Sequence, residues 1–139
     1  MSQLPQHRPY QLSLGQLERE ILEIIWQLGE TSAKAIHEVI LADPDRELTY
    51  ASVMTVLGRL EKKGWVAPRR EKRSIFWRAL VTAEEAQSLW AYHQLQSFLK
   101  ISNADMVAAF VDDLDQSEQD KLQAIAEKLQ AMRRQRQGE

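Results

Sequence analysis

The sequence predicts a mainly α-helical protein with one small β-hairpin. Apolar residues recur at helical spacing in several separate stretches of the 139-residue chain. Two short runs of β-prone residues lie close together near its middle, at 65–67 and 75–77. Hydrophobic residues make up 44% of the chain and charged residues 27%, a balance typical of a folded globular protein.

The first two helices are predicted from their end signals. Ser13 and Gln16 match a capping box, in which two side chains satisfy free N–H groups at a helix start. Apolar residues then follow helical spacing up to Gly29, which is expected to end this helix. The second helix is expected to begin after Ser32. Its predicted buried residues are Ala35, Ile36, Val39 and Ile40.

A third helix and a hairpin follow. Residues 49–63 are predicted to be helical, because two lysines occupy their last turn and Gly64 is a favourable residue after a helix end. The β-prone runs at 65–67 and 75–77 predict two antiparallel strands, joined by a basic loop at 68–74. Three short helices and a basic hairpin are the components of a winged helix-turn-helix domain.

The remainder of the chain is predicted to be helical. Thr82 and Glu85 match a second capping box, and Ser102 and Ser117 are the expected N-caps of two more helices. This stretch is too long for a cap and too short for an independent domain. We therefore predict a flexible tail, a winged-helix domain and a C-terminal helical dimerisation segment, at residues 1–12, 13–81 and 82–139.

Composition excludes several classes of function. The chain has no cysteine, which rules out disulfides, thiolate metal sites and cysteine nucleophiles. No stretch approaches the ~20 apolar residues of a membrane span, and the first residues lack the apolar core of a signal peptide, so we expect a cytoplasmic protein without membrane insertion. His7, His37 and His93 are too dispersed to form a ligand set. We expect no catalytic site, no metal and no cofactor.

Charge is sorted along the chain. The formal net charge is only -2, yet residues 59–78 carry +6 and residues 101–120 carry −6. A basic run taken alone is more often a solvated face than a nucleic-acid site. Its interpretation therefore depends on the helix that precedes it.

The predicted third helix has an unusual exposed face. At roughly 100° per residue, its buried stripe is Val53, Val56, Leu57 and Leu60. The opposite stripe is Ala51, Thr55, Gly58 and Lys62. Gly58 costs a helix about 1 kcal/mol relative to alanine, so small residues here suit the close approach of another surface. A DNA major groove is such a surface.

Together, the small exposed residues and the basic hairpin favour nucleic-acid binding. Ser52 and Thr55 have hydroxyl groups that suit base edges, while the basic residues suit phosphates. The candidate DNA-binding residues are Thr49, Ala51, Ser52, Thr55, Arg59, Lys62, Lys63, Arg69, Arg70, Lys72 and Arg73.

The C-terminal helices are predicted to pair with a second copy of the chain. Leu122, Ile125, Leu129 and Met132 form a seam of one and a half heptads. A helical annex without its own core is better stabilised by a partner chain than by packing back on its own domain. The candidate dimerisation residues are Trp90, Phe98, Met106, Phe110, Leu122, Ile125 and Leu129.

Two segments resemble the penicillinase-repressor family (BlaI, MecI and CopY types). Residues 48–64, LTYASVMTVLGRLEKKG, resemble its recognition helix, and residues 17–26, LEREILEIIW, resemble its first helix. The likeness extends more weakly over roughly residues 13–130. It implies a homodimeric transcriptional repressor that binds a palindromic double-stranded DNA operator through the recognition helix 49–63 and a basic wing at 69–74.

The resemblance also implies a mechanism of release. In antibiotic-responsive members a membrane metalloprotease sensor cuts the repressor in its dimerisation region, and the matching bond here is Ala109–Phe110. The copper-responsive branch uses C-terminal cysteine pairs, which this chain lacks. Ala51 and Gly58 also depart from the family's usual residues, so a different operator is expected. Two alternatives stay open: a regulator released by a small ligand, and a winged-helix module for protein–protein contact.

Overall fold

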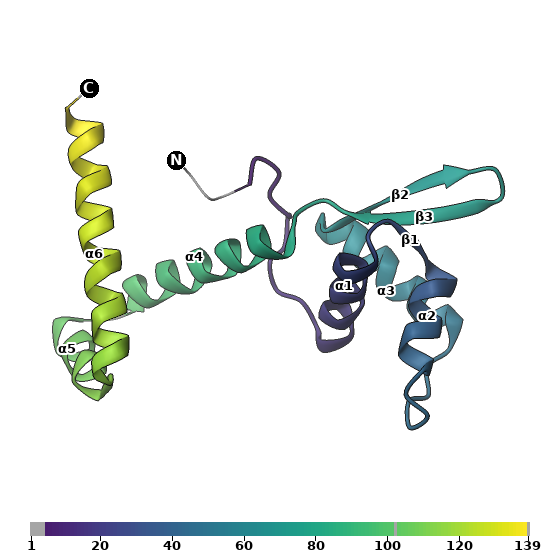
Figure 1. The fold of residues 1–139 in the computed structure, drawn as a ribbon, viewed down its shortest axis with the longest axis horizontal. Helices are drawn as coiled ribbons and strands as arrows, with labels where there is room; N and C mark the ends of the chain where they lie inside the picture. The colour runs from purple at the N-terminus through teal and green to yellow at the C-terminus, as the bar shows by residue number, and fades with distance from the viewer. Residues whose placement is uncertain (1–4, 102, 139) are drawn as a thin grey trace. The chain divides into compact units, whose positions relative to one another are not determined.

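The computed structural model describes residues 5–101 and 103–138. The chain divides into two compact units, Met1–Gln94 and Leu95–Glu139. The elements in chain order are α1 (Gln16–Leu28), β1 (Thr31–Ser32), α2 (Ala33–Leu41), α3 (Tyr50–Lys63), β2 (Val66–Glu71), β3 (Ser74–Ala79), α4 (Ala83–Ile101), α5 (Ala104–Asp113) and α6 (Gln116–Gln137) (Figure 1). The predicted fold class, mainly helical with a small hairpin, is confirmed.

Two of the predicted helix ends near the N-terminus are confirmed and one is wrong. Gly29 ends α1 with a φ of 79°, and the Ser32 side chain accepts a backbone hydrogen bond of 3.1 Å in the first turn of α2. The capping box at Ser13 does not form, because α1 begins after Gly15 without any side-chain cap. The carbonyl of Ser13 instead accepts a hydrogen bond of 3.0 Å from Lys63 Nζ, which ties this segment to the end of α3.

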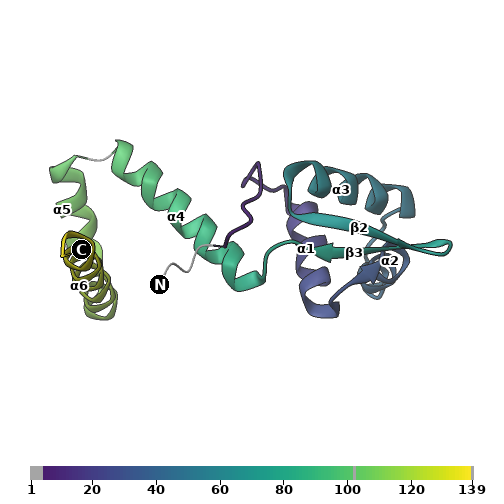
Figure 2. The ribbon, with the colours of Figure 1, turned by 90° about the horizontal axis from the view of Figure 1, so that it is seen from above.

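The third helix agrees with its prediction, but the hairpin is longer than predicted. Thr49 caps the start of α3, and Gly64 follows its end with a φ of 87°. Strands β2 and β3 pair from Val66↔Ala79 to Glu71↔Ser74, which leaves only residues 72–73 in the turn. The predicted loop at 68–74 is therefore mostly strand. The turn end projects beyond the helices of the first unit in both views (Figure 1 and Figure 2).

A third strand completes the sheet and was not predicted. Its order is β1-β3-β2, with Thr31 opposite Trp77 and Ser32 opposite Phe76. A strand of two residues carries no detectable alternation, so the sequence offers no signal for it. The order also explains Pro68 inside β2, because an edge strand tolerates a residue without an N–H group.

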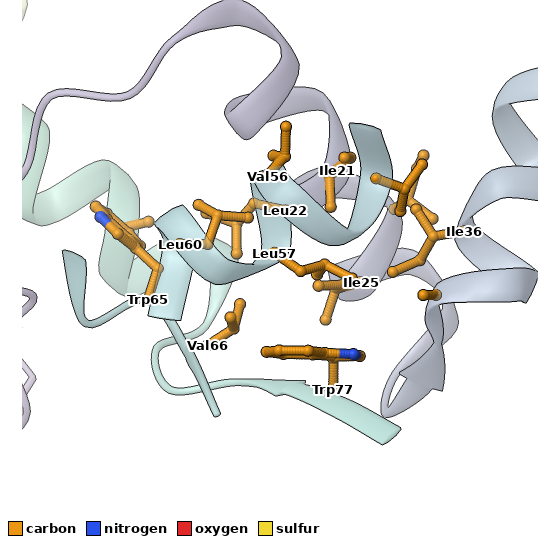
Figure 3. Close-up of a cluster of buried hydrophobic side chains, with 14 of the residues drawn as sticks. Ile21, Leu22, Ile25, Ile36, Val56, Leu57, Leu60, Trp65, Val66 and Trp77 are labelled. Carbon is orange, nitrogen blue, oxygen red and sulfur yellow. The ribbon is translucent and has the colours of Figure 1, made fainter. Parts of the chain in front are cut away.

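The core of the first unit joins its three short helices to the sheet (Figure 3). Its fully buried side chains include Ile21, Leu22 and Ile25 from α1, Ile36 from α2, Leu57 and Leu60 from α3, and Trp65 and Val66. Trp77 of β3 also belongs to this core and is 5% exposed. Val39 was expected to be buried but is 42% exposed, because Ala33, Ile36 and Ile40 already form the core stripe of α2. This core positions the opposite face of α3 toward solvent.

Residues 5–12 pack against the first unit, which corrects the expected flexible tail. Tyr10 N donates to Lys63 O at 2.8 Å. The indole Nε1 atoms of Trp65 and Trp90 donate to Gln11 O and Leu12 O, both at 2.9 Å. Buried N–H groups need acceptors, and this segment supplies them. Residues 1–4 lie outside the described part of the chain.

Helix α4 starts as predicted and belongs to both units. Thr82 and Glu85 exchange hydrogen bonds of 2.9 and 3.0 Å, which confirms the second capping box. Ala86 and Leu89 are buried in the core of the first unit. The boundary between the units therefore falls within α4, after Gln94, and not at the predicted position before residue 82.

The caps of the last two helices differ from the predicted serines. Asn103 caps α5 through a 2.9 Å hydrogen bond to Met106 N, and Ser102 lies outside the described residues. Asp115 caps α6 through a 2.8 Å bond to Glu118 N, so Ser117 falls inside the helix. Asp and Asn compete equally with serine for this position, which the sequence pattern did not resolve.

Candidate nucleic-acid interface

The solvent face of α3 is the one expected from its periodicity. Ala51, Thr55, Arg59 and Lys62 are exposed, and Gly58 is half-buried. A Cβ atom placed on Gly58 would meet no atom within 4 Å. The chain's own packing therefore does not require glycine at this position, although glycine weakens a helix interior by about 1 kcal/mol.

The hydroxyl groups at the start of α3 are already engaged with the backbone. Thr49 Oγ1 accepts a 3.1 Å hydrogen bond from Ser52 N and lies 2.8 Å from Ser52 Oγ. Thr55 Oγ1 donates to Ala51 O at 3.0 Å. A hydroxyl has one hydrogen and two acceptor lone pairs. Thr55 therefore presents an acceptor and a methyl group to an incoming surface.

Lys63, one of the two lysines predicted to contact DNA at the end of α3, forms contacts within the first unit. Lys63 Nζ lies 2.7 Å from Glu18 Oε2 and donates to Ser13 O at 3.0 Å. Its side chain is only 18% exposed. Because this pairing holds the end of α3 on α1, the structure does not place Lys63 with the outward-facing cations.

Arg69 is also paired within the protein. Its guanidinium forms ion pairs with Glu30 and, at 3.0 Å, with Glu71, and it lies 5.3 Å from the centroid of the Phe76 ring. Hydrogen bonds to Glu30 and Glu71 raise the pKa of Arg69 further above its usual value. The remaining predicted cations are exposed and form no ion pair with any described residue: Arg59, Lys62, Arg70, Lys72 and Arg73.

The predicted dimerisation residues fall into two groups. Trp90 lies in the first unit, half-buried, with its ring 5.3 Å from that of Trp65. Phe98 and Phe110 lie in the second unit with ring centroids 5.7 Å apart. Four of the predicted dimerisation residues have exposed side chains in this unit: Met106 (51%), Phe110 (49%), Leu122 (39%) and Ile125 (51%). The side chain of Leu129 lies outside the described part.

The predicted cleavage site lies within a helix. Ala109 and Phe110 are both exposed on α5. Among the described residues, no three His, Cys, Asp or Glu side chains gather into a group that could hold a metal ion. No described helix is long and apolar enough to cross a membrane.

Comparison with known proteins places the chain among regulators. A family model described as penicillinase repressor matches residues 14–131. A transcriptional regulator BlaI from Mycobacterium tuberculosis is 40% identical over 62 residues, which are 44% of each chain. An uncharacterised 16.5 kDa protein from Latilactobacillus sakei is 27% identical over 106 residues, covering 76% of this chain and 71% of that one. The oxidised form of MarR from E. coli has a TM-score of 0.46 at 18% identity, with 71% of each chain covered.

Proposed function

The chain belongs to the penicillinase repressor family, and we propose that it represses transcription by binding a palindromic DNA operator as a homodimer. Family membership makes it a DNA-binding transcriptional repressor and not an enzyme. The observation that carries the finer proposal is the solvent face of α3, where small residues stand beside exposed cations that form no ion pair with a described residue. Such a protein works where the chromosome lies, and the proposed location is the cytoplasm.

The proposed contacts divide between base edges and phosphates. Thr55 and Ala51 lie on the exposed face of α3, where a major groove could approach the backbone closely. Arg59 and Lys62 flank this face, and the hairpin adds further exposed cations. Phosphate contacts set position and affinity, whereas base contacts set sequence preference.

The proposed dimer rests on the apolar side chains of the second unit. Exposed Met106, Phe110 and Ile125 would lose their contact with water in a dimer. Two linked winged helices would then bind half-sites about 34 Å apart, or a multiple of that distance. We propose that a membrane metalloprotease sensor releases the repressor by cutting at Ala109–Phe110, which would separate all of α6 and the last four residues of α5 from the first unit.

The test is selection of duplexes from a random-sequence library, followed by affinity measurements at several salt concentrations. We expect a palindromic sequence to be enriched and its affinity to fall steeply with salt, because each neutralised phosphate releases a counterion. Binding that does not depend on salt, or no enrichment of any duplex, would contradict the proposal.

A second candidate is a repressor released by a small ligand. A cavity of about 560 Å³ in the first unit supports it, because this volume suits a small molecule. Arg19, Trp90 and His93 are among its lining residues. Ligand screening by thermal shift, with Arg19→Ala as the matched variant, separates this candidate from proteolytic release. The third alternative, a module for protein–protein contact alone, is not favoured by membership of a repressor family.

A further inference from the structure

The cavity of about 560 Å³ in the first unit lies between the start of α1 and helix α4. It is lined by residues 12–16 and Arg19, and by Trp90, His93 and Gln94 of α4. All of these residues lie within Met1–Gln94, so the first unit forms the cavity by itself. We call it the Trp90 cavity.

The Trp90 ring is a fixed wall of the Trp90 cavity. Its indole Nε1 donates to Leu12 O at 2.9 Å, and its centroid lies 5.3 Å from that of the fully buried Trp65 ring. The guanidinium carbon of Arg19 lies 4.2 Å from the centroid of the Trp90 ring. A cation over an aromatic face is attracted by the ring. This contact therefore orients the Arg19 side chain at the cavity before a ligand arrives.

The donors of Arg19 are available to a ligand. Arg19 is exposed, and its side chain forms no ion pair or hydrogen bond with any described residue. No aspartate or glutamate is among the residues that line the cavity. A guanidinium carries five N–H donors in a planar fork that matches the two oxygens of a carboxylate. The cavity therefore suits an anionic group at Arg19.

The size and the remaining lining of the cavity favour an organic acid over an inorganic ion. Sites for small organic molecules have volumes of roughly 300–1,000 Å³, and an inorganic ion would fill little of the Trp90 cavity. Leu12 and Leu14 line it and are half-buried, so they offer apolar surface. We propose, resting on the repressor released by a small ligand, that the Trp90 cavity is an effector site. Its ligand is a small carboxylic acid with an apolar body, and Arg19 binds the carboxylate.

The Trp90 cavity is connected to the recognition helix. Ser13 lines the cavity, and its carbonyl accepts the 3.0 Å hydrogen bond from Lys63 at the end of α3. Lys63 Nζ also lies 2.7 Å from Oε2 of Glu18, the residue before Arg19. A ligand shifts an equilibrium only when it binds two states unequally. Because residues 13–19 hold the end of α3, a ligand that moves them should displace α3 and lower operator affinity.

The first test measures whether the native protein binds phenylacetate, benzoate or octanoate. Two-dimensional NMR separates the indole N–H signals of the four tryptophans, and Trp90→Phe identifies the signal of Trp90. We expect a carboxylate to shift this signal and to leave that of Trp77, which does not line the cavity, in place. Phenylacetamide has nearly the same shape as phenylacetate but no charge. It should bind at least about tenfold more weakly, because it lacks the charge-assisted hydrogen bonds.

The second test compares Arg19→Gln with Arg8→Gln. The control removes the same charge from an exposed residue of the same unit that does not line the cavity. Arg19→Gln should weaken phenylacetate binding by at least about tenfold, whereas Arg8→Gln should retain native binding. The comparison of phenylacetate with phenylacetamide uses the native protein, so it stands even if Arg19→Gln is unstable.

The third test measures operator affinity with and without phenylacetate at constant ionic strength. We expect phenylacetate to lower the affinity of the native protein by at least about fivefold, and to leave that of Arg19→Gln unchanged. If the native protein enriches no duplex, the proposed function itself fails. If it binds DNA but none of the three carboxylates, the site is overturned while the repressor stands. Equally tight binding of phenylacetamide or inorganic phosphate would overturn the ligand class, and binding without any effect on operator affinity would overturn the effector role.

Discussion

The cations of α3 and the hairpin fall into two sets, those that form ion pairs within the protein and those that are exposed to solvent and form none with a described residue. Lys63 holds the partly buried Glu18, and Arg69 is paired with Glu30 and Glu71. Neighbouring Lys62 and Arg70 are exposed and form no ion pair with any described residue. Replacing a cation that is paired within the protein should therefore affect folding. Replacing a neighbouring exposed cation should affect DNA binding.

Replacing Lys63 should mainly lower the stability of the protein, whereas replacing Lys62 should mainly weaken its binding to DNA. Lys63→Met leaves the Glu18 carboxylate, in a residue only 8% exposed, without its cation. We expect the free energy of unfolding to fall by roughly 1–3 kcal/mol. Lys62→Met, the matched control, should leave stability within about 0.5 kcal/mol and weaken DNA binding. Urea unfolding and duplex titration check both; equal stability of the two variants would contradict the pairing.

Thr55→Val should change which bases are preferred. Valine has nearly the same shape as threonine, but it removes the hydroxyl that Thr55 presents on the exposed face. We expect a change of roughly 1–3 kcal/mol in discrimination at one position of each half-site. Arg70→Ala should instead weaken all duplexes equally. Repeating the duplex selection with each variant distinguishes the two, and an unaltered preference in Thr55→Val would remove this residue from base recognition.

The sequence was enough to predict which residues of α3 face solvent. It was not enough to predict which cations of α3 and the hairpin form ion pairs. Helical periodicity placed Ala51 and Thr55 opposite the core, and the structure agrees. Glu18, the partner of Lys63, lies on α1, and Glu30, one of the two partners of Arg69, lies in the segment after α1, so both are far away in the sequence. No local pattern indicates such pairs, because they depend on how the elements pack.

At the scale of elements, two glycines of α3 and its cap offer a direct contrast. Gly58→Ala adds a Cβ into open space and removes the helix cost of glycine, so stability should rise by about 1 kcal/mol. The same Cβ would stand where a major groove is proposed to approach, so operator affinity should fall.

Gly64→Ala should destabilise the protein. Gly64 has a φ of 87°, and its added Cβ would lie 3.0 Å from Tyr10 Cδ2 and 3.1 Å from Tyr10 N. We expect a loss of at least about 1 kcal/mol, from left-handed strain alone. Thermal unfolding of both variants, with duplex titration of Gly58→Ala, tests the pair. A Gly58→Ala protein that is more stable and binds DNA as tightly as the native chain would contradict the close approach.

Elements with strong end signals were predicted well, and those defined by pairing were not. Gly64 and the two lysines before it marked the end of α3 correctly, because capping is local. The hairpin was predicted too short because Pro68 looked like a loop residue, although an edge strand accepts it.

At the scale of the whole molecule, the boundary between the units depends on contacts that composition does not reveal. Residues 10–12 supply backbone groups to Lys63, Trp65 and Trp90, so an apparently structureless segment is part of the first unit. The first turns of α4 also pack on this unit, through Ala86 and Leu89. Helical periodicity alone does not specify such contacts, because they join segments that lie far apart in the sequence.

The proposed dimer leads to the last prediction. One winged helix contacts too few base pairs to distinguish an operator from the many competing sites of a genome. Linking two copies makes the second contact intramolecular and can raise avidity by ~10²–10⁴. Phe110 is 49% exposed on α5, and Phe110→Asp would place a carboxylate on the proposed apolar interface. Ala108→Asp, at an exposed position of the same helix, is the matched control.

Light scattering should give twice 16.1 kDa for the native chain and for Ala108→Asp, but a smaller mass for Phe110→Asp. Operator affinity of Phe110→Asp should fall by the avidity factor, ~10²-fold or more. All four tryptophans lie within Met1–Gln94, so near-UV circular dichroism reports the fold of the first unit separately. Its spectrum should be unchanged in Phe110→Asp, which would assign the lost affinity to the dimer and not to unfolding. A native chain that is monomeric at micromolar concentration and still binds its operator tightly would show that one copy suffices, and the tethered-dimer mechanism would be wrong.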